Sequence, residues 1–293
     1  MVAVIKDRKE AVAGYLFLLP ALGGILVFIL GPVVAAIALS FTKWDLLTPA
    51  KFIGLSNYQE LIQDPMFRKV MLNTLIFTGA SAPLSLILSL GLALALNQKI
   101  KGIVVFRTIY FLPVVSSMVA VSLVWRWLYN PNYGLLNYFL NLLHLPSVNW
   151  LFSTTWAMPA VILMSVWKGL GYNMVIFLAG LQGIPQMYYE SAKIDGAGKF
   201  QAFKNITLPL LSPTTFFVLV ISIISSFQVF DQIFVMTSGG PAHATEVIIY
   251  YIYHNAFQIF RMGYASALAF CLFIIIFALT LLQIRLSKRW VFY

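Results

Sequence analysis

Charged side chains are scarce in this chain. Asp, Glu, Lys and Arg make up only 10% of its 293 residues, whereas soluble domains carry about a quarter. Hydrophobic residues account for 61% of the chain, and the mean hydropathy is +0.89. This composition excludes a water-soluble globular domain and indicates a membrane protein.

Acidic residues are the rarer charged group, with 9 Asp and Glu against 19 Lys and Arg, so the formal net charge is +10. A basic excess of this kind can indicate nucleic-acid binding. Here, however, the basic residues stand singly beside apolar runs, form no stripe and fit no nucleic-acid-binding module. We therefore expect no nucleic-acid partner and attribute the excess to orientation in a membrane.

Cysteine and histidine are almost absent. The single cysteine, Cys271, excludes an internal disulfide, and its place inside an apolar run favours a buried, inert thiol. The three histidines, His144, His243 and His254, are scattered along the sequence without the spacing of metal ligands. The sequence therefore predicts neither a metal site nor a cofactor bound by this chain.

Long apolar runs dominate instead. Six segments reach the roughly 20 residues needed to cross the hydrocarbon core of a bilayer; they are about 14–41, 70–97, 104–128, 156–183, 213–237 and 264–286. The first follows basic residues as a signal peptide would, but it is far longer than a cleavable core of roughly 7–15 residues. Small residues in the second segment suit close helix packing; they are Gly79, Ala80, Ser81, Ser89, Gly91 and Ala93. We expect an all-α integral membrane protein, a six-span helical bundle over residues 13–287.

Lys and Arg are distributed unevenly between the two predicted sides of this bundle. One side holds twelve, namely Lys6, Arg8, Lys9, Lys99, Lys101, Arg107, Lys193, Lys199, Lys204, Arg285, Lys288 and Arg289. The other side holds five, namely Lys43, Lys51, Arg68, Lys69 and Arg261. Because cytoplasmic loops are enriched in Lys and Arg, both termini are expected in the cytoplasm, as tails at 1–12 and 288–293. The polar loop at 184–212 is then cytoplasmic as well.

That loop has the pattern of a helical hairpin. Pro185 can stand at the start of a helix, Gly196 can adopt the left-handed conformation that ends one, and Asp195 can cap the helix that follows. Small residues would let the backbone of another protein approach closely; they are Ser191, Ala192, Ala197 and Gly198. Spacing alone leaves open whether the hairpin docks a partner protein or is a plain surface element.

The same loop resembles the EAA loop of permeases from binding-protein-dependent ABC importers. The pattern of that loop is Glu-Ala-Ala, three residues, Gly, nine residues and Ile-x-Leu-Pro, and the chain matches it at Glu190, Ala192, Gly196, Ile206, Leu208 and Pro209. It departs at Ser191, where the pattern has Ala, and serine is small enough to leave the docking inference intact. Further stretches look like the carbohydrate-importer branch of these permeases; they are residues 41–44, 52–58, 73–74, 177–185 and 238–241.

This resemblance implies a permease of the type I importer kind, a transport subunit without its own ATPase site, in the cytoplasmic membrane of a bacterium or archaeon. It implies a heterodimer with a second homologous permease, two ATP-binding cassette subunits that hold ATP and Mg²⁺, an extracytoplasmic solute-binding protein and a sugar substrate. It also assigns the coupling to the ATPase to this loop, at Glu190, Ser191, Ala192, Asp195, Gly196, Ala197, Ile206, Leu208 and Pro209.

Two short motifs suggest other functions. Residues 195–200 look like the end of a phosphate-binding loop, but they lack the earlier Gly and the Ser or Thr after the lysine. Residues 79–82 resemble the Gly-x-Ser-x of an intramembrane serine protease, yet the three histidines fall in predicted outer loops, away from Ser81. An intramembrane serine hydrolase and an ATP-independent facilitator stand as alternatives, and neither explains the 184–209 loop.

Polar residues at membrane depth form two clusters, in the fourth and fifth predicted spans. Such residues are costly in a bilayer unless they line a cavity or pair with one another. Hydroxyl, amide and aromatic side chains are suited to binding a sugar, and we expect a substrate pathway lined by Trp167, Lys168, Tyr172, Asn173, Ser225, Gln228, Asp231 and Gln232. For each of these residues helix packing is the competing interpretation, and Lys168 and Asp231 could instead pair across helices.

Overall fold

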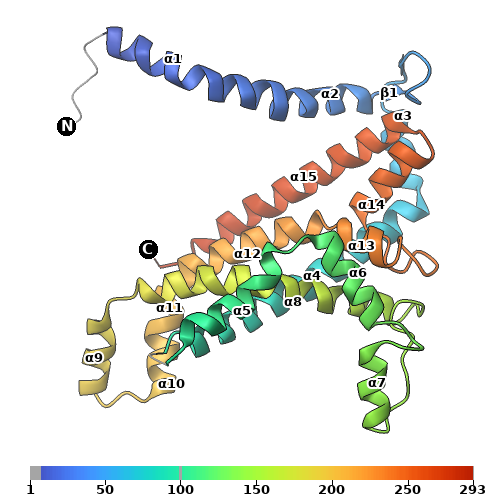
Figure 1. The fold of residues 1–293 in the computed structure, drawn as a ribbon. Coiled ribbons are helices and arrows are strands. Elements are labelled where there is room, and N and C mark those ends of the chain that lie inside the picture. The colour runs from blue at the N-terminus through green and yellow to red at the C-terminus, as the bar shows by residue number, and fades with distance from the viewer. Residues whose placement is uncertain (1–7, 99–100, 293) are drawn as a thin grey trace. The chain divides into compact units, whose positions relative to one another are not determined.

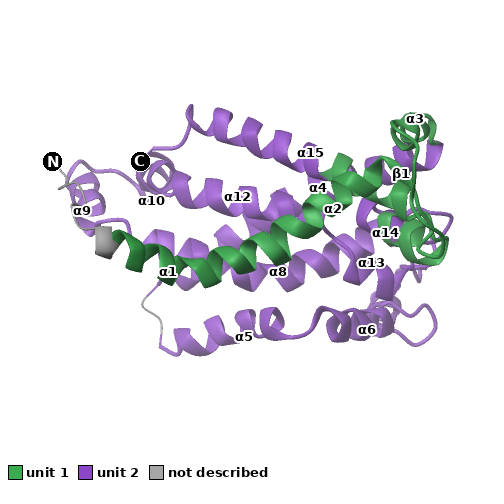
Figure 2. Ribbon diagram, turned by 90° about the horizontal axis from the view of Figure 1, so that it is seen from above, with its two compact units in different colours: residues 1–64, 252–272 green, residues 65–251, 273–293 purple. Residues whose placement is uncertain are grey.

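A computed structural model describes residues 8–98 and 101–292. The chain divides into two compact units, one formed by residues 1–64 and 252–272 and the other by residues 65–251 and 273–293 (Figure 2). Most of the predicted N-terminal tail, including Lys6, lies outside the described residues, and so does Lys99.

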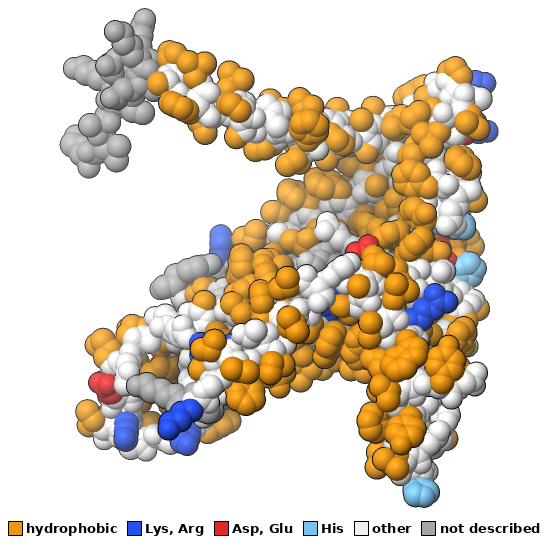
Figure 3. Space-filling model, viewed as in Figure 1, with side chains coloured by type: hydrophobic (Ala, Val, Ile, Leu, Met, Phe, Trp, Pro, Cys, Tyr) orange, Lys and Arg blue, Asp and Glu red, His pale blue; other side chains and the backbone are white. Residues whose placement is uncertain are grey.

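The first unit begins with an apolar helix of three consecutive pieces (Figure 1). They are α1 (Arg8–Ile25), the π-helical turn η1 (Leu26–Leu30) and α2 (Gly31–Ser40). Large side chains along this helix are exposed, such as Phe17 at 86% and Phe28 at 80%, and Figure 3 shows hydrophobic side chains along it. Apolar surface of this extent on a helix suits contact with lipid or with another membrane chain.

The rest of the first unit is a small structure built around a two-stranded ribbon. Its elements are β1 (Thr42–Lys43), β2 (Lys51–Phe52), α3 (Ser56–Gln63), the π-helical turn η3 (His254–Gln258) and the first part of α15 (Met262–Ser287). The strands are antiparallel, with Thr42 opposite Phe52 and Lys43 opposite Lys51. The buried Asn57 side chain donates hydrogen bonds to the carbonyls of Ser40 and Thr42, at 2.8 and 2.9 Å.

The second unit is a helical bundle. Its elements are α4 (Pro65–Leu96), α5 (Ile103–Val115), α6 (Met118–Leu128), α7 (Leu135–Leu142), α8 (Ala157–Gln182), α9 (Gln186–Ile194), α10 (Lys199–Ala202), the π-helical turn η2 (Phe203–Thr207), α11 (Leu208–Leu210), α12 (Ser212–Phe227), α13 (Asp231–Met236), most of α14 (Ile248–Tyr253) and the remainder of α15. The long helices α4 and α8 pack along each other, α12 lies against both, and α5 lies against α8.

Glycines on α8 allow neighbouring helices to approach closely. A Cβ atom on Gly171 would lie 2.2 Å from the Tyr110 carbonyl oxygen of α5, and one on Gly180 would lie 2.5 Å from Thr214 Oγ1 of α12. On α4, the small residues predicted for packing divide into two groups. Ser81, Ser89 and Ala93 are buried, whereas Gly79, Ala80 and Gly91 are exposed. Among the described residues nothing lies within 4 Å of a Cβ atom built on Gly79 or Gly91, so close packing is observed only for the first group.

Four helical stretches among the described residues are long and apolar enough to cross a membrane, and six if two bent pairs each count as one span. Five of them overlap predicted spans along most of their length. The sixth is the pair Lys199–Leu210 and Ser212–Phe227, bent by 63°, which overlaps the fifth predicted span, 213–237, only over residues 213–227. The all-α membrane fold is confirmed, but the continuity of the predicted spans differs from the prediction in two places. The third span is two helices, α5 and α6, bent by 99°; Pro113 lies in the last turn of α5, and Ser116 and Ser117 that follow are extended.

The fifth predicted span, 213–237, is also interrupted. The helix α12 ends at Phe227, three non-helical residues follow, and α13 begins at Asp231. A hydropathy window averages over such a break because the residues on both sides are apolar. Non-helical backbone at membrane depth is stable where it lines a cavity. A cavity is therefore expected beside residues 228–230.

Candidate functional site

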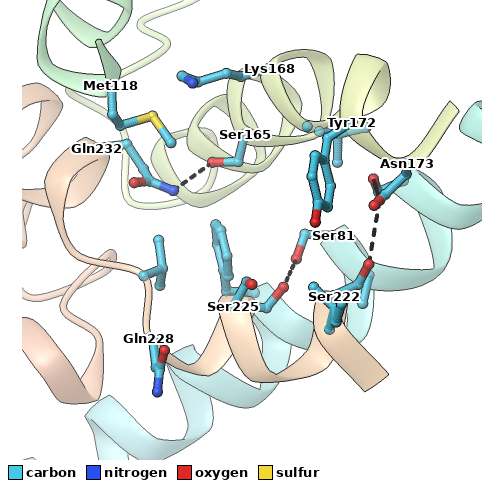
Figure 4. Close-up of a pocket in the computed structure, with 18 of the residues that line it drawn as sticks. Ser81, Met118, Ser165, Lys168, Tyr172, Asn173, Ser222, Ser225, Gln228 and Gln232 are labelled. Carbon is cyan, nitrogen blue, oxygen red and sulfur yellow. Dashed lines mark hydrogen bonds between the residues drawn. The ribbon is translucent and has the colours of Figure 1, made fainter. Parts of the chain in front are cut away.

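A cavity of about 410 Å³ lies between α4, α8, α12 and the break before α13. Figure 4 shows polar side chains from these elements directed into it. The residues that line it are Phe77, Ser81, Ala82, Ser85, Val114, Met118, Ser165, Val166, Lys168, Gly169, Tyr172, Asn173, Ile221, Ser222, Ser225, Ser226, Gln228, Val229, Phe230, Asp231 and Gln232. Seven of the eight residues expected to line a pathway are therefore brought together.

Trp167 is the exception, because it does not line this cavity. Its ring packs against Trp125 of α6 with 5.3 Å between ring centroids. Trp125 in turn contacts Tyr129, which contacts Trp150. One step along a helix rotates a side chain by about 100°, so Trp167 faces this aromatic cluster while Lys168 faces the cavity.

Hydrogen bonds between side chains join the helices around the cavity. Asn173 Nδ2 on α8 donates to Ser85 Oγ on α4 at 3.0 Å and to Ser222 Oγ on α12 at 3.4 Å. Ser81 Oγ of α4 and Ser226 Oγ of α12 lie 3.1 Å apart and share a hydrogen bond. These bonds satisfy polar groups that would otherwise be unpaired in an apolar environment.

One further bond crosses the cavity at the break. Gln232 Nε2 of α13 donates to Ser165 Oγ of α8 at 3.1 Å. The break itself is held by backbone bonds from Gln228 N to the carbonyl oxygens of Ile224 and Ser225, both at 3.2 Å. The Gln228 side chain is left exposed to the cavity, so the interrupted helix contributes polar groups that a continuous apolar span would lack.

The sequence prediction missed the contribution of the second span. Ser81, Ser85 and Ser89 recur at intervals of four on α4 and are all buried, and the first two line the cavity. Serines at this spacing share one face of a helix, so the signal was present in the sequence.

Lys168 and Asp231 both line the cavity but form no ion pair with each other. The Lys168 ammonium lies 3.5 Å from the carbonyl oxygen of Val114. Asp231 opens α13 and is exposed; a carboxylate is favourable at the start of a helix. The suggested cross-helix pair is therefore not observed, and both charges face the cavity.

The second candidate site is the hairpin formed by α9 and α10. The chain turns at Gly196, whose φ of +76° is left-handed. Ala197 N donates to the Ala192 carbonyl at 2.8 Å, and Gly196 N donates to that of Lys193 at 3.2 Å. This pair of bonds is the Schellman ending of a helix, and the predicted helix end at Gly196 is confirmed.

The start of the second helix differs from the prediction. Its N-cap is Gly198, whose N–H donates to the side-chain oxygen of Gln201 at 2.7 Å. Asp195 instead ends α9 and does not cap α10, because the turn needs two further residues after Gly196. A bond of 3.0 Å between the hydroxyls of Tyr189 and Thr207 ties α9 to η2, the turn that continues directly from α10.

The outer surface of the hairpin combines exposed apolar and charged side chains. Met187, Ile194 and Phe200 are 64%, 86% and 75% exposed. Of the residues expected to couple to an ATPase, Glu190, Ser191, Asp195, Gly196 and Leu208 are exposed, and Ala192, Ala197, Ile206 and Pro209 are partly exposed. Lys and Arg side chains lie at this end of the second unit (Figure 3). Apolar side chains displayed this way are typical of a protein contact surface.

The motifs that suggested other activities lack the required geometry. Ser81 Oγ shares its hydrogen bond with another hydroxyl, that of Ser226, rather than with a general base. Lys199 is the first residue of α10 and follows a turn that is closed by the chain's own backbone bonds. Neither an activated serine nor a phosphate-binding loop is present at these positions.

Residues 69–291 match the family described as the inner membrane component of binding-protein-dependent transport systems. The match covers most of the chain, and the chain belongs to this family. Members are permease subunits, which have no ATPase site of their own, so the chain is a transport subunit of the inner membrane and not an enzyme.

Two curated relatives show how far the similarity extends. The probable ABC transporter permease protein YesP of Bacillus subtilis is 38% identical, over 98% of this chain and 94% of its own length. The trehalose/maltose transport system permease protein MalF of Thermococcus litoralis is 37% identical, over 96% of this chain and 95% of its own.

A solved structure agrees with this assignment. It is a bacterial alginate ABC transporter in complex with a periplasmic protein that holds an alginate pentasaccharide. One of its chains superposes with a TM-score of 0.87 at 27% identity, with 98% of each chain covered. The fold described above is therefore that of an ABC importer permease.

Proposed function

We propose that this permease forms half of the translocation pathway of an ATP-driven sugar importer. The observation that carries the proposal is the cavity beside the helix break, in which hydroxyl, amide and charged groups face a space at membrane depth. Sugars are bound through many hydrogen bonds, and a polar cavity inside an apolar bundle supplies donors and acceptors where lipid offers none. Relatives whose names include trehalose/maltose transport and sn-glycerol-3-phosphate transport favour such a substrate.

The lining residues divide into two roles. Asn173 and Gln232 hold neighbouring helices together through their bonds to serines. Lys168, Tyr172, Ser225, Gln228 and Asp231 line the cavity without a hydrogen bond to one another, and they are the groups we assign to substrate. The remaining wall of the pathway would come from a second, homologous permease subunit.

The α9–α10 hairpin is the proposed site of coupling to the ATPase. Its backbone geometry is fixed by the Gly196 turn and the Tyr189–Thr207 bond, so it can move as a unit. Its exposed apolar side chains suit a cleft on one of two ATP-binding cassette subunits, which would hold ATP and Mg²⁺. Closure of the ATPase would then pull on α8 and α12, the helices at either end of the hairpin segment, and switch the cavity between the two sides of the membrane.

The charges at the hairpin end of the second unit favour one orientation of the chain in the membrane. The Phe292 N–H donates to Ser212 Oγ at 2.9 Å, so the C-terminal residues lie beside the start of α12. Lys101, Lys193, Lys204 and Lys288 belong to segments at this end of the second unit (Figure 1). The positive-inside rule favours this end as cytoplasmic. The opposite end would then meet an extracytoplasmic solute-binding protein.

Transport by the reconstituted assembly tests this function. The chain, its partner permease, the ATPase and the binding protein would be placed in proteoliposomes, and uptake of labelled oligosaccharides would be measured with and without enclosed ATP. We expect uptake only with ATP and binding protein present. Equal uptake without ATP would contradict the proposal and restore the facilitator alternative. No feature of the site supports that alternative or the serine hydrolase.

A further inference from the structure

The ribbon of the first unit sets two lysines directly against each other. Lys43 on β1 and Lys51 on β2 are paired across the antiparallel strands. Side chains paired in this way share one face, with Cβ atoms about 5 Å apart, and like charges at such positions destabilise the strands. Both lysines are exposed, and among the residues that the structure describes neither forms an ion pair. The ribbon therefore concentrates positive charge that the described chain does not neutralise.

Both lysines line a cavity of about 450 Å³ whose acidic residues are already engaged. Glu60 binds Arg261 through both carboxylate oxygens, each 2.6 Å from Nη2. Asp45 accepts bonds from the backbone N–H and the hydroxyl of Thr48 at 2.7 and 2.8 Å. These bonds hold the pKa of the Asp45 carboxyl below its usual range, so it stays ionised but turned to its own loop.

The charges around this cavity leave one positive charge in excess. Its basic residues are Lys43, Lys51 and Arg261, and its acidic residues are Asp45 and Glu60. With Arg261 bound to Glu60, the excess resides on the two lysines. A ligand that carries a single negative charge would complete the site.

The positions of the two lysines are fixed by the surrounding backbone. Asn57 holds the carbonyls on either side of the turn into β1. Gly263 lies so close to β1 that a Cβ atom there would be 1.9 Å from the Thr42 carbonyl oxygen. The ammonium groups therefore project from a rigid base, and only their side-chain torsions must be ordered when a ligand binds.

The place of the ribbon in the chain favours a position at the depth of lipid headgroups. It follows directly on the apolar helix Ala11–Ser40, whose 30 residues span about 45 Å, more than the roughly 30 Å of a hydrocarbon core. Trp44, which lines the cavity, is a residue type enriched at the membrane interface. Leu47, in the loop between the two strands, and Phe52, which follows Lys51 in β2, are 84% and 79% exposed. Figure 3 shows basic and hydrophobic side chains together at this end of the first unit.

We propose that the Lys43–Lys51 cavity binds the phosphate of an anionic phospholipid, with the phosphate between the two ammonium groups. The single charge of a phosphatidylglycerol headgroup matches the excess on the lysines, whereas a zwitterionic headgroup carries its own cation. Trp44, which lines the same cavity, then contacts the glycerol and the upper acyl chain. This aromatic side chain favours a lipid over free phosphate, which has no apolar part to contact it.

Lipid retention tests the site. The full-length chain, purified from membranes in mild detergent with whatever partners accompany it, would be equilibrated with mixed micelles of phosphatidylglycerol and phosphatidylcholine. Retained lipid would be quantified by mass spectrometry. We expect the wild-type chain to retain phosphatidylglycerol preferentially, and Lys43→Gln/Lys51→Gln to retain about tenfold less. Lys43→Arg/Lys51→Arg should keep it, and Lys193→Gln/Lys199→Gln, which removes equal charge from the hairpin, should not alter it.

Three results would overturn the proposal. The first is equal phosphatidylglycerol retention by the wild type and the double glutamine variant. The second is displacement of the lipid by an excess of inorganic phosphate, which would identify a site for the free anion. The third is loss of binding-protein association in the double variant with lipid retention unchanged, which would identify an acidic protein surface as the occupant. If the double variant does not accumulate, Lys43→Gln alone takes its place in the retention assay. The melting temperature of the wild type is then also compared in the two lipids. A melting temperature no higher in phosphatidylglycerol than in phosphatidylcholine would contradict the proposal.

Discussion

The side-chain amide of Asn173 on α8 donates a hydrogen bond to Ser85 Oγ on α4, across 3.0 Å. The same amide nitrogen lies 3.4 Å from Ser222 Oγ on α12. One buried residue therefore links the three helices that enclose the cavity. Because no hydrophobic effect holds helices together within a bilayer, this contact stabilises the cavity wall alongside close packing.

Replacing Asn173 should loosen these helices. In Asn173→Ala, two serine hydroxyls lose a donor, and each interhelical bond of this kind stabilises a membrane protein by about 0.6 kcal/mol, up to about 1.7. We expect a lower melting temperature of the purified chain and slower transport. Val175→Ala is the control, because this side chain is on the same helix and 43% exposed. Equal melting temperatures for the two variants would contradict the assigned role.

Substitution of Gly196 should weaken the hairpin. Its φ of +76° costs a residue with a Cβ about 1–2 kcal/mol, so Gly196→Ala should reduce both ATPase association and transport. Gly196→Asn should recover part of each, since Asn tolerates the left-handed region better. Co-purification of the ATPase measures the effect.

The control for this prediction lies two residues away. Gly198 has a φ of −73°, and a Cβ atom there would meet only Gln201 Oε1, at 3.8 Å. Gly198→Ala introduces no backbone strain, so it should reduce association clearly less than Gly196→Ala does. A loss of the same size in both variants would show that the turn geometry at Gly196 is not what matters.

The sequence was sufficient to predict some of these features because their causes are local. Each span is a long and predominantly apolar stretch, and the Gly196 turn is specified by one glycine between two short helices. The helix break at 228–230 was not predictable in this way. Apolar residues on both sides conceal it, and its stability comes from the cavity that it lines.

Contacts between helices were the second kind of feature that the sequence could not predict. Ser85 and Asn173 are 88 positions apart, and no local pattern pairs them. Trp167 and Lys168 looked equivalent in the sequence, yet one packs on Trp125 and the other faces the cavity. Only the relative rotation of α6 and α8 distinguishes them.

Close packing at Gly180 offers a stability test. A Cβ atom there would overlap Thr214 Oγ1 at 2.5 Å and Leu211 Cδ1 at 2.8 Å. Overpacking of this kind costs about 1–3 kcal/mol, so Gly180→Ala should lower the melting temperature. Gly91→Ala on α4 is the matched control, because a Cβ atom there meets nothing within 4 Å and alanine is the better helix former. We expect Gly180→Ala to melt at a lower temperature than Gly91→Ala. The reverse order would contradict the close contact between α8 and α12 at Gly180.

Lys168 should affect substrate handling without affecting the fold. Among the described residues no ion pair holds its ammonium group, which donates to the Val114 carbonyl oxygen across 3.5 Å. Lys168→Gln should therefore raise the KM of transport several-fold while the melting temperature stays close to that of the wild type. Leu163→Ala, on the exposed side of the same helix, should change neither quantity. A large drop in melting temperature for Lys168→Gln would indicate a structural role instead.

Phe200 provides the last test, of the hairpin as a docking surface. Its side chain is 75% exposed, so Phe200→Ser should change the stability of the chain by less than about 0.5 kcal/mol. An exposed aromatic residue on a contact surface can nevertheless contribute about 2 kcal/mol or more to binding. We therefore expect ATPase association to fall at least tenfold, measured by co-purification and by ATP hydrolysis in the assembled complex. Phe217→Ser is the control, since this phenylalanine is 52% exposed on α12, outside the hairpin. Retention of the ATPase by Phe200→Ser at the wild-type level would place the contact elsewhere on the chain.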